Sequence, residues 1–425
     1  DYSGVPMPLS RKLELSPQVA TKVVLQWLQE HEYIEAAGTL AAESGVQYMD
    51  GELPVAGMLD TAMGMYVPSM LAPAEGGGQN GESKEDLEMV QRLMGLESGI
   101  CVTGVEAGVP GLHKTNITCV DWAPLEEDSS DTSLVLTGSV DRTLRVVNMG
   151  GDGVVAELEG FTSPLLSVSV HHPSKRGLVA CMGGEVVLVD LTSITTPKIV
   201  EQWKAHTKMA QAVSWNPQGT RFVTVSKDAS ASLFAAKDGS FELVRNLPFL
   251  NEVTCMAWIS ETEWVVAVRE DNNLHYFDET TEVAKTNMNA TGDSHVSFAV
   301  LSMQASPDKS MLLCCTDKSR LIAFRSKTSF QARNFYGATV DSFDTPVCAW
   351  SHDGTYVYCT SSVNTSTLLL GQLVVWEVKS QSKLMTIDVH DKNVRTMARH
   401  PYTEAFATGS YDKAVKVLAC GAGLS

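Results

Sequence analysis

The sequence is short of basic residues, long apolar runs and paired cysteines, and each shortage argues against a class of function. Its 32 lysines and arginines are outnumbered by 50 aspartates and glutamates, which gives a formal net charge of −18. Proteins that bind nucleic acid or anionic membranes need clustered positive charge, so neither is expected as a partner. No run approaches the roughly 20 apolar residues of a membrane-spanning helix, and residues 1–16 lack the apolar centre of a signal peptide.

The nine cysteines form no CxxC pair, and most of them lie in apolar runs typical of strands. This pattern favours reduced thiols in the core of an intracellular protein over a disulfide framework or a zinc site. We therefore expect a cytoplasmic location, with the nucleus as the alternative. The glycine-rich stretch "EGGGQNG" has neither the lysine nor the strand–helix context of a phosphate-binding loop. We expect no metal and no cofactor.

What the sequence does contain is a repeat. Twelve residues recur three times in similar form, as "LTGSVDRTLRVV" at 136–147, "VTVSKDASASLF" at 223–234 and "ATGSYDKAVKVL" at 407–418. Each copy has Thr in second place and Asp in sixth place. The aspartates are 87 and 184 residues apart, which fits two and four units of about 43 to 46 residues.

A second marker gives the number of units. Strand-like segments that end near a proline or a polar turn recur seven times, and their last inward positions are spaced by 43 to 49 residues. These positions are Trp122, Val170, Trp215, Trp258, Ala305, Trp350 and Arg399. Seven units therefore follow one another at a nearly constant period, as in repeat proteins.

Each unit contains several short runs rich in Val, Thr, Leu, Ile and aromatic residues, separated by Gly, Asp, Asn and Ser. Such runs predict β-strands. One small sheet cannot bury both of its faces, whereas seven sheets stacked around an axis bury them all and leave only short edges. The sequence thus predicts an all-β, seven-bladed β-propeller.

The repeat resembles the WD-repeat family of seven-bladed propellers over residues 99–425. In that family, a loop His, a Ser or Thr on the second strand, an Asp in the next turn and a Trp on the third strand share buried hydrogen bonds. Three units carry the first three positions: His113, Thr137 and Asp141; His206, Thr224 and Asp228; and His390, Thr408 and Asp412. The expected Trp is replaced in these units by Val147, Phe234 and Leu418. Blades two, four, five and six are degenerate.

These three sets are expected to be structural and not catalytic. His, a hydroxyl residue and Asp are also the components of a hydrolytic triad. An enzyme needs one such site, however, whereas this set recurs three times in the same register with its Thr in mid-strand. Mutual hydrogen bonding satisfies the polar atoms of these side chains when they are buried. We therefore predict a structural hydrogen-bond network and no enzymatic activity.

The seventh sheet needs a strand from elsewhere in the chain. Its last run, "AVKVLA" at 414–419, is followed only by "CGAGLS". The resemblance implies that residues before the first blade supply the missing outer strand. We predict "GICVTGV", at 99–105, as the donor.

Residues 23–46 have apolar side chains at helical spacing, which predicts two short helices. The segment resembles the LisH motif at Val24, Trp27, Leu28, Tyr33, Ala37 and Leu40. The Gly and Thr that this family usually has are Glu32 and Ala36 here. So short a segment cannot form a core of its own, so we expect it to pair with a second copy. A heterotypic LisH partner and packing against the propeller are the alternatives.

We therefore divide the chain into a helical dimerisation or docking segment (1–50), a linker (51–98) and the propeller (99–425). The linker is rich in Met and Gly and includes "SKEDLEMVQRLMGLESG" at 83–99, which predicts a short helix. Ser83 and Asp86 would form its capping box. Its apolar face would comprise Leu87, Val90, Leu93 and Met94.

Together these features predict a noncatalytic scaffold in a multiprotein complex, with other proteins as its partners. The LisH segment would dimerise or recruit, and the propeller would serve as the platform. A regulatory subunit of a cytoskeletal motor or ciliary assembly, or a substrate-recognition subunit of a ubiquitin ligase, is the alternative. Exposed residues beside the turn Asp often face partners in such propellers, and we predict Lys227 and Tyr411 for this role.

Overall fold

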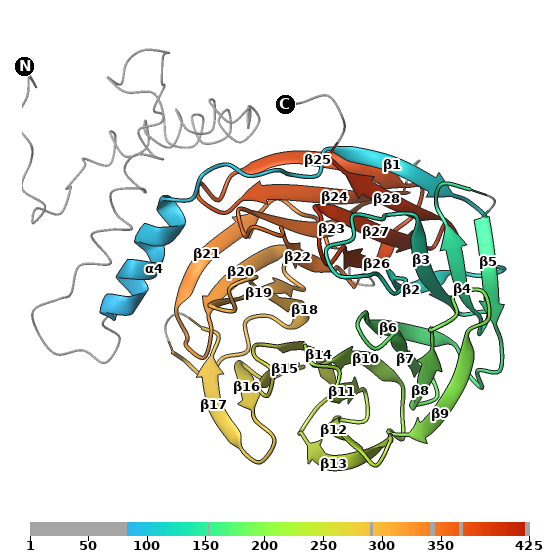
Figure 1. Cartoon of the computed structure of the whole chain (residues 1–425). Helices are drawn as coiled ribbons and strands as arrows, with labels where there is room; N and C mark the ends of the chain where they lie inside the picture. The colour runs from blue at the N-terminus through green and yellow to red at the C-terminus, as the bar shows by residue number, and fades with distance from the viewer. Residues whose placement is uncertain (1–82, 152, 290–291, 341–344, 365–368, 421–425) are drawn as a thin grey trace, which may run out of the picture. The chain divides into compact units, whose positions relative to one another are not determined.

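Figure 1 shows the computed structural model, which describes residues 83–151, 153–289, 292–340, 345–364 and 369–420. The predicted LisH segment lies outside these residues. The chain divides into two units, Asp1–Glu88 and Met89–Ser425. The second unit contains all the described strands. The account below concerns this unit, together with the first residues of one helix that belong to the first unit.

The described strands form seven antiparallel sheets of four strands each, which we number as blades one to seven. Blade one contains β2 (Ile117–Trp122), β3 (Leu134–Ser139), β4 (Leu144–Asn148) and β5 (Gly153–Leu158). Blade two contains β6 (Leu165–His171), β7 (Arg176–Cys181), β8 (Glu185–Asp190) and β9 (Lys198–Lys204). Blade three contains β10 (Ala210–Trp215), β11 (Arg221–Ser226), β12 (Ser230–Lys237) and β13 (Ser240–Pro248).

The remaining blades follow the same order. Blade four contains β14 (Val253–Trp258), β15 (Trp264–Val268), β16 (Asn273–Phe277) and β17 (Glu282–Asn287). Blade five contains β18 (Val300–Ala305), β19 (Met311–Thr316), β20 (Arg320–Arg325) and β21 (Gln331–Tyr336). Blade six contains β22 (Cys348–Trp350), β23 (Tyr356–Asn364), β24 (Leu369–Glu377) and β25 (Lys383–His390). Blade seven contains β26 (Val394–Arg399), β27 (Ala405–Ser410), β28 (Val415–Ala419) and β1 (Gly104–Val109).

The sheets are arranged around a central axis, with the first strand of each blade innermost (Figure 1). The predicted seven-bladed all-β propeller is therefore confirmed. Six of the seven periodic positions seen in the sequence are the last residues of inner strands, and Val170 is the last but one of β6. The period was readable because every inner strand ends at the same level of the ring, where the next turn begins.

The second and third strands of each blade are buried on both faces, because neighbouring blades pack against them. Every residue of β19 is buried, for example. Between blades three and four, Val223 and Leu233 pack in one cluster with Val266 and Phe277. The outer strands differ: β1 and β9 alternate between half-buried and exposed residues. The core therefore consists of the layers between blades.

Three tryptophans at the ends of inner strands connect neighbouring blades. The indole N–H groups donate to backbone carbonyls of the preceding inner strand in the ring, from Trp122 to Ala398 at 3.2 Å, from Trp258 to Ser214 at 3.3 Å and from Trp350 to Gln304 at 3.2 Å. Each indole thus buries a large apolar surface while its polar atom is satisfied. These contacts explain why Trp recurs at the marker position.

Strand β1 completes blade seven by pairing with β28, from Gly104 opposite Ala419 to Val109 opposite Val415. The predicted donor, 99–105, overlaps β1 only at its last two residues and was wrong in position. Its apolar part packs elsewhere: Val102 is fully buried beside blade six, and its N–H donates to the Tyr358 hydroxyl at 3.1 Å. An outer strand has one face in solvent and carries few apolar residues, so its position is hard to recognise in the sequence.

Helix α4 (Lys84–Met94) begins at the predicted capping box. The N–H of Ser83 donates to Asp86 Oδ2 at 2.8 Å, and the N–H of Asp86 donates to Ser83 Oγ at 3.2 Å. These reciprocal bonds satisfy backbone donors that a helix N-terminus leaves without intrahelical partners. The predicted short helix is therefore confirmed.

The apolar face of α4 differs in part from the prediction. Met89 and Leu93, four residues apart, are buried in the cluster that joins blades five and six, beside Phe335. Met94 was expected on this face but is exposed. The packed face of α4 therefore follows the residues four apart that include Met89 and Leu93. It does not extend to the last residue of the helix.

Removal of β1 is expected to open the ring, because the backbone groups of β28 would lose their partners. A chain that starts at residue 110 should unfold at a temperature lower by more than about 10 °C, or without a single transition, compared with a chain that starts at Met89. A third chain, which starts at Gly99, keeps β1 without α4. Thermal denaturation followed by circular dichroism measures all three, and equal midpoints for the chains that start at 99 and 110 would show that β1 does not close the ring.

Candidate interaction surfaces

Two of the three predicted polar trios form the expected hydrogen bonds. In blade one, His113 Nδ1 lies 3.1 Å from Asp141 Oδ2 and His113 Nε2 lies 2.9 Å from Thr137 Oγ1. In blade seven, the corresponding distances are 2.9 Å from His390 to Asp412 and 3.0 Å from His390 to Thr408. Both histidines are buried.

The charge state of the first trio follows from its surroundings. Burial lowers the pKa of His113, so this imidazole is neutral at pH 7. Burial also disfavours the charged form of Asp141, but hydrogen bonds from Thr143, from the N–H of Lys114 and from His113 outweigh it and lower the pKa of that carboxyl. A neutral imidazole then donates from Nδ1 to Asp141 and accepts from Thr137 at Nε2. This arrangement ties the loop before β2 to the β3–β4 turn.

The trio of blade three is assembled differently. His206 Nδ1 lies 2.9 Å from Ser230 Oγ and 3.3 Å from Asp228 Oδ2. The expected contact with the Thr224 hydroxyl is not the one formed, since this hydroxyl donates to the carbonyl of Ala212 at 3.1 Å. The prediction is corrected at this residue: His206 takes the Ser230 hydroxyl as its partner, and Thr224 bonds to a carbonyl on the paired strand β10.

A cavity of about 600 Å³ runs along the central axis and is lined by residues from all seven inner strands or the turns beside them. Its polar side chains connect neighbouring blades by accepting hydrogen bonds from backbone N–H groups. The pairs are Val120 N to Thr396 Oγ1 at 3.2 Å, Cys348 N to Ser302 Oγ at 3.1 Å and Trp350 N to Gln304 Oε1 at 2.7 Å. These N–H groups are therefore not available to an added strand.

Asp121 has the same role between blades one and two. Its Oδ2 accepts from the N–H of Val170 at 2.7 Å and its Oδ1 accepts from the N–H of Trp122 at 2.8 Å. Burial outweighs these two bonds and raises the pKa of Asp121 to about 7. The seam between the first two blades therefore contains a carboxyl that titrates near neutrality.

Two segments match the family described as WD domain, G-beta repeat, at residues 110–148 and 381–417. They contain the two trios in which His contacts both Thr and Asp. The chain is a seven-bladed propeller that contains WD40 repeats. No curated protein matched it. WD40 propellers are generally platforms for protein interaction and are typically noncatalytic.

The described part of this WD40 propeller contains no group of three or more His, Cys, Asp and Glu side chains placed to hold a metal. Seven of its cysteines are buried, and the described residues form no disulfide. Among these residues, no helix is long and apolar enough to cross a membrane. None of the nine trio residues lines either of the two cavities described here.

The first mouth of the channel lies where the inner strands begin. Both predicted partner-facing residues lie at this level of the ring, and Lys227 also lines the cavity. Lys227 follows Ser226, which pairs with the first residue of β10, and Tyr411 follows Ser410, which pairs with the first residue of β26. The Lys227 amine lies 3.7 Å from Glu252, and Tyr411 is half-buried. That Lys227 and Tyr411 contact a partner protein remains a prediction.

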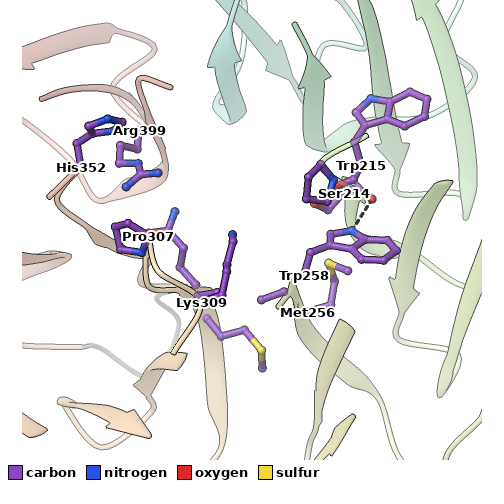
Figure 2. A pocket seen from close by; sticks show the side chains of 13 residues that line it. Ser214, Trp215, Met256, Trp258, Pro307, Lys309, His352 and Arg399 are labelled. Carbon is purple, nitrogen blue, oxygen red and sulfur yellow. Dashed lines mark hydrogen bonds between the residues drawn. The ribbon is translucent and has the colours of Figure 1, made fainter. Parts of the chain in front are cut away.

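The second mouth lies where the inner strands end and contains a separate cavity of about 490 Å³ (Figure 2). Pro307, His352 and Arg399 stand on one side of it, and Trp215 and Trp258 stand on the other. Lys309, in the turn between β18 and β19, lies between these two sides in Figure 2. The lining residues include no carboxylate.

Sequence reasoning missed Lys309 and Asp121, and it used Arg399 only as a marker of the period. A signal for Asp121 was present, because polar residues such as Ser302, Gln304 and Thr396 recur on inner strands that are otherwise apolar. No such signal existed for Lys309. Its turn lies near Arg399 because blades five and seven converge on the same mouth of the channel.

Replacement of a trio aspartate should destabilise the WD40 propeller by leaving buried donors without partners. We expect Asp412→Ala and Asp141→Ala each to lower the free energy of unfolding by about 1–3 kcal/mol. Denaturant titration measures the change. Asp391→Ala is the matched control, because this exposed side chain lies beside the trio while its backbone bond to Asp412 is kept. Equal stabilities of the Asp391 and Asp412 variants would contradict a structural role for the trio.

The raised pKa of Asp121 predicts a pH dependence of stability. The protonated carboxyl is favoured in the folded state, so its contribution is complete below the ordinary carboxyl pKa and is lost as the pH rises through about 7. The stability of Asp121→Asn relative to the wild type should therefore increase between pH 4 and pH 8, by roughly 1.4 kcal/mol per unit of pKa shift. Denaturant titrations at several pH values test this. A difference that does not change with pH would show that Asp121 ionises normally.

Proposed function

We propose that this protein is a noncatalytic scaffold, in which the WD40 propeller binds other proteins and the N-terminal segment dimerises or recruits a partner. The observation that supports the first part most directly is the placement of the trios. The side chains that most resemble catalytic groups are used to hold turns of blades one, three and seven, and their histidines are buried. The surfaces of the ring are left for binding.

The propeller is suited to this role because its shape is held from several directions. The indole and side-chain bonds across the channel fix each inner strand to its neighbour, and β1 ties the two ends of the ring together. A platform that is rigid before binding loses little conformational entropy when a partner docks. The two mouths of the channel offer two separate surfaces, and Lys227 and Tyr411 belong to the first.

Pairing through residues 1–50 is proposed from the apolar positions alone. Trp27 and Leu28 stand at the centre of the LisH-like pattern, and such a short helical pair needs a second surface to bury them. A second copy of this chain is the proposed partner. Dimerisation would present two propellers at once and raise the effective concentration of the second binding event.

More specific roles remain proposals within this function. A regulatory subunit of a cytoskeletal motor or ciliary assembly and a substrate-recognition subunit of a ubiquitin ligase would both use a propeller as a binding platform. A cytoplasmic location is proposed for any of these roles, since the buried cysteines are consistent with a reducing compartment.

The experiment is a comparison of the full chain with a chain that lacks residues 1–50 and with a Trp27→Ala, Leu28→Ala variant. Light scattering should give a dimer for the full chain and a mass lower by about half for both altered forms. Affinity purification of each form from its native cell, followed by mass spectrometry, measures partner recovery. Recovery by the shortened chain assigns partners to the propeller.

Two outcomes would contradict parts of this proposal. A mass per complex that does not fall when residues 1–50 are removed would exclude pairing through this segment. A propeller that recovers no protein in any form would contradict the scaffold function itself. Charge reversal of Lys227 and truncation of Tyr411 then test whether partners bind at the first mouth. If these variants recover the same partner proteins as the unaltered chain, the first mouth is excluded as the binding surface.

A further inference from the structure

We propose that the second mouth of the channel binds an acidic segment of a partner protein, with an aspartate or glutamate side chain seated between Lys309 and Arg399. The inference rests on the proposed scaffold function and specifies the chemistry of one partner. Contacts, charge and burial around the second cavity support it.

The first support is that the Lys309 amine has no carboxylate partner among the described residues. Other lysines do have such a partner: the amines of Lys175, Lys204, Lys237 and Lys327 are within 2.6–2.9 Å of a glutamate oxygen. Lys309 is exposed and lines the cavity. An anionic group from outside the chain would satisfy it.

Arg399 provides the second cation. Its Nη1 donates to the carbonyls of Ser351 at 3.1 Å and Trp350 at 3.4 Å, which holds the side chain against blade six. A guanidinium has five N–H donors, and the remaining ones have no partner among the described residues. Both cations line the same cavity, and burial, followed by the charge of Arg399, lowers the pKa of Lys309. A bound carboxylate would relieve this repulsion.

Three carboxylates close in sequence to the lining residues contact other groups. Asp308 Oδ2 pairs with the Arg92 guanidinium at 2.8 Å, and Asp353 Oδ1 accepts from the Thr355 hydroxyl at 2.6 Å. Glu404 Oε2 accepts from the N–H of His352 at 2.7 Å, while its Oε1 has no hydrogen-bond partner among the described residues, and burial raises the pKa of this carboxyl. Glu404 still attracts Arg399 and opposes the lowering of its pKa. None of these carboxylates lines the cavity, so its lining keeps a positive charge.

The chemistry of the lining favours a carboxylate over a free phosphate. The indoles of Trp215 and Trp258 are buried, and the Trp258 N–H donates to the Ser214 carbonyl at 3.3 Å (Figure 2). Met256 and Pro217 also line this side of the cavity. Phosphate sites typically gather backbone N–H groups and several cations, whereas two cations suit a single carboxylate.

Helix α4 holds the turn that presents Lys309. Arg92 Nη1 pairs with Asp308, and its Nη2 donates to Ser310 Oγ at 2.7 Å, so one guanidinium contacts the residues on both sides of Lys309. Leu93 anchors this part of the helix in the core between blades five and six. The amine is therefore presented from a supported turn, which reduces the entropy lost when a ligand binds.

The net charge of the protein opposes the approach of an acidic partner, but the local charge should dominate. Exposed charges are screened within about 8 Å at physiological ionic strength, so most of the acidic surface contributes little at the mouth. Partly buried charges are screened less. The attraction of Lys309 and Arg399 is exerted at contact distance, where it exceeds the residual repulsion.

The test uses the full chain and a fluorescein-labelled blocked peptide, Gly-Asp-Glu-Leu-Asp-Glu-Gly, with its Lys-substituted counterpart as the charge control. Fluorescence anisotropy measures the affinity. We expect Lys309→Glu to weaken binding of the acidic peptide at least tenfold and Lys309→Gln to weaken it several-fold. The matched control is Lys318→Glu, because Lys318 is an exposed lysine at the other end of β19 in the same blade. This control should change affinity less than twofold.

Several outcomes would overturn the inference. These are no binding of the acidic peptide to the wild type, equal loss in the Lys309 and Lys318 variants, or binding of inorganic tripolyphosphate through Lys309 without binding of the peptide. Thermal denaturation shows whether each variant folds. If Lys309→Glu does not fold, the neutral Lys309→Gln variant is used for the comparison in its place. Failure here while the full chain still recovers cellular proteins contradicts only this site. Failure of all recovery contradicts the scaffold function.

Discussion

The pairing of β1 with β28 is the constraint on which the rest of the structure depends. Six blades are continuous in the chain, but the seventh contains strands from both ends of the propeller. Without that pairing, the layers between blades seven and one would be open, and the Trp122 indole that reaches Ala398 would lose its support. Both cavities exist only because the ring is closed, since residues of blade seven line each of them.

Closure also explains why the innermost strands carry so many polar residues. An inner strand has one edge without a backbone partner, and seven such edges meet around the channel. Side chains such as Asp121, Ser302 and Gln304 bond to the N–H groups of the next blade. The same residues therefore hold the blades together and limit what the channel can bind, because strand addition at these edges would compete with bonds already made.

Positive charge lines both cavities of the channel. In the cavity along the axis, Lys227 and Arg269 share one carboxylate partner, Glu252, and Arg395 is a further lining cation. At the second mouth, Lys309 and Arg399 line the cavity, and its described lining residues include no carboxylate. The lack of a carboxylate in this lining distinguishes the second mouth and gives it its proposed selectivity.

The sequence alone determined the class of fold and the number of blades. The period of the inner-strand markers and the Asp of the turns are local features that survive without knowledge of contacts, and the capping box of α4 is local too. The trios in blades one and seven were predictable for the same reason. Thr224 was not, because Ser230 supplies the hydroxyl that contacts His206 while Thr224 bonds to β10, and only the packing of this blade decided between the two hydroxyls.

Only the tertiary structure decided the register of closure and the chemistry of the mouths. Residues 99–103 are more apolar than β1, yet Val102 is buried beside blade six while the less apolar β1 forms the outer strand. Lys309 and Arg399 are 90 positions apart and lie near each other because the inner strands converge on one axis. Convergence at a ring axis is a long-range property, and no local pattern in this sequence encodes it.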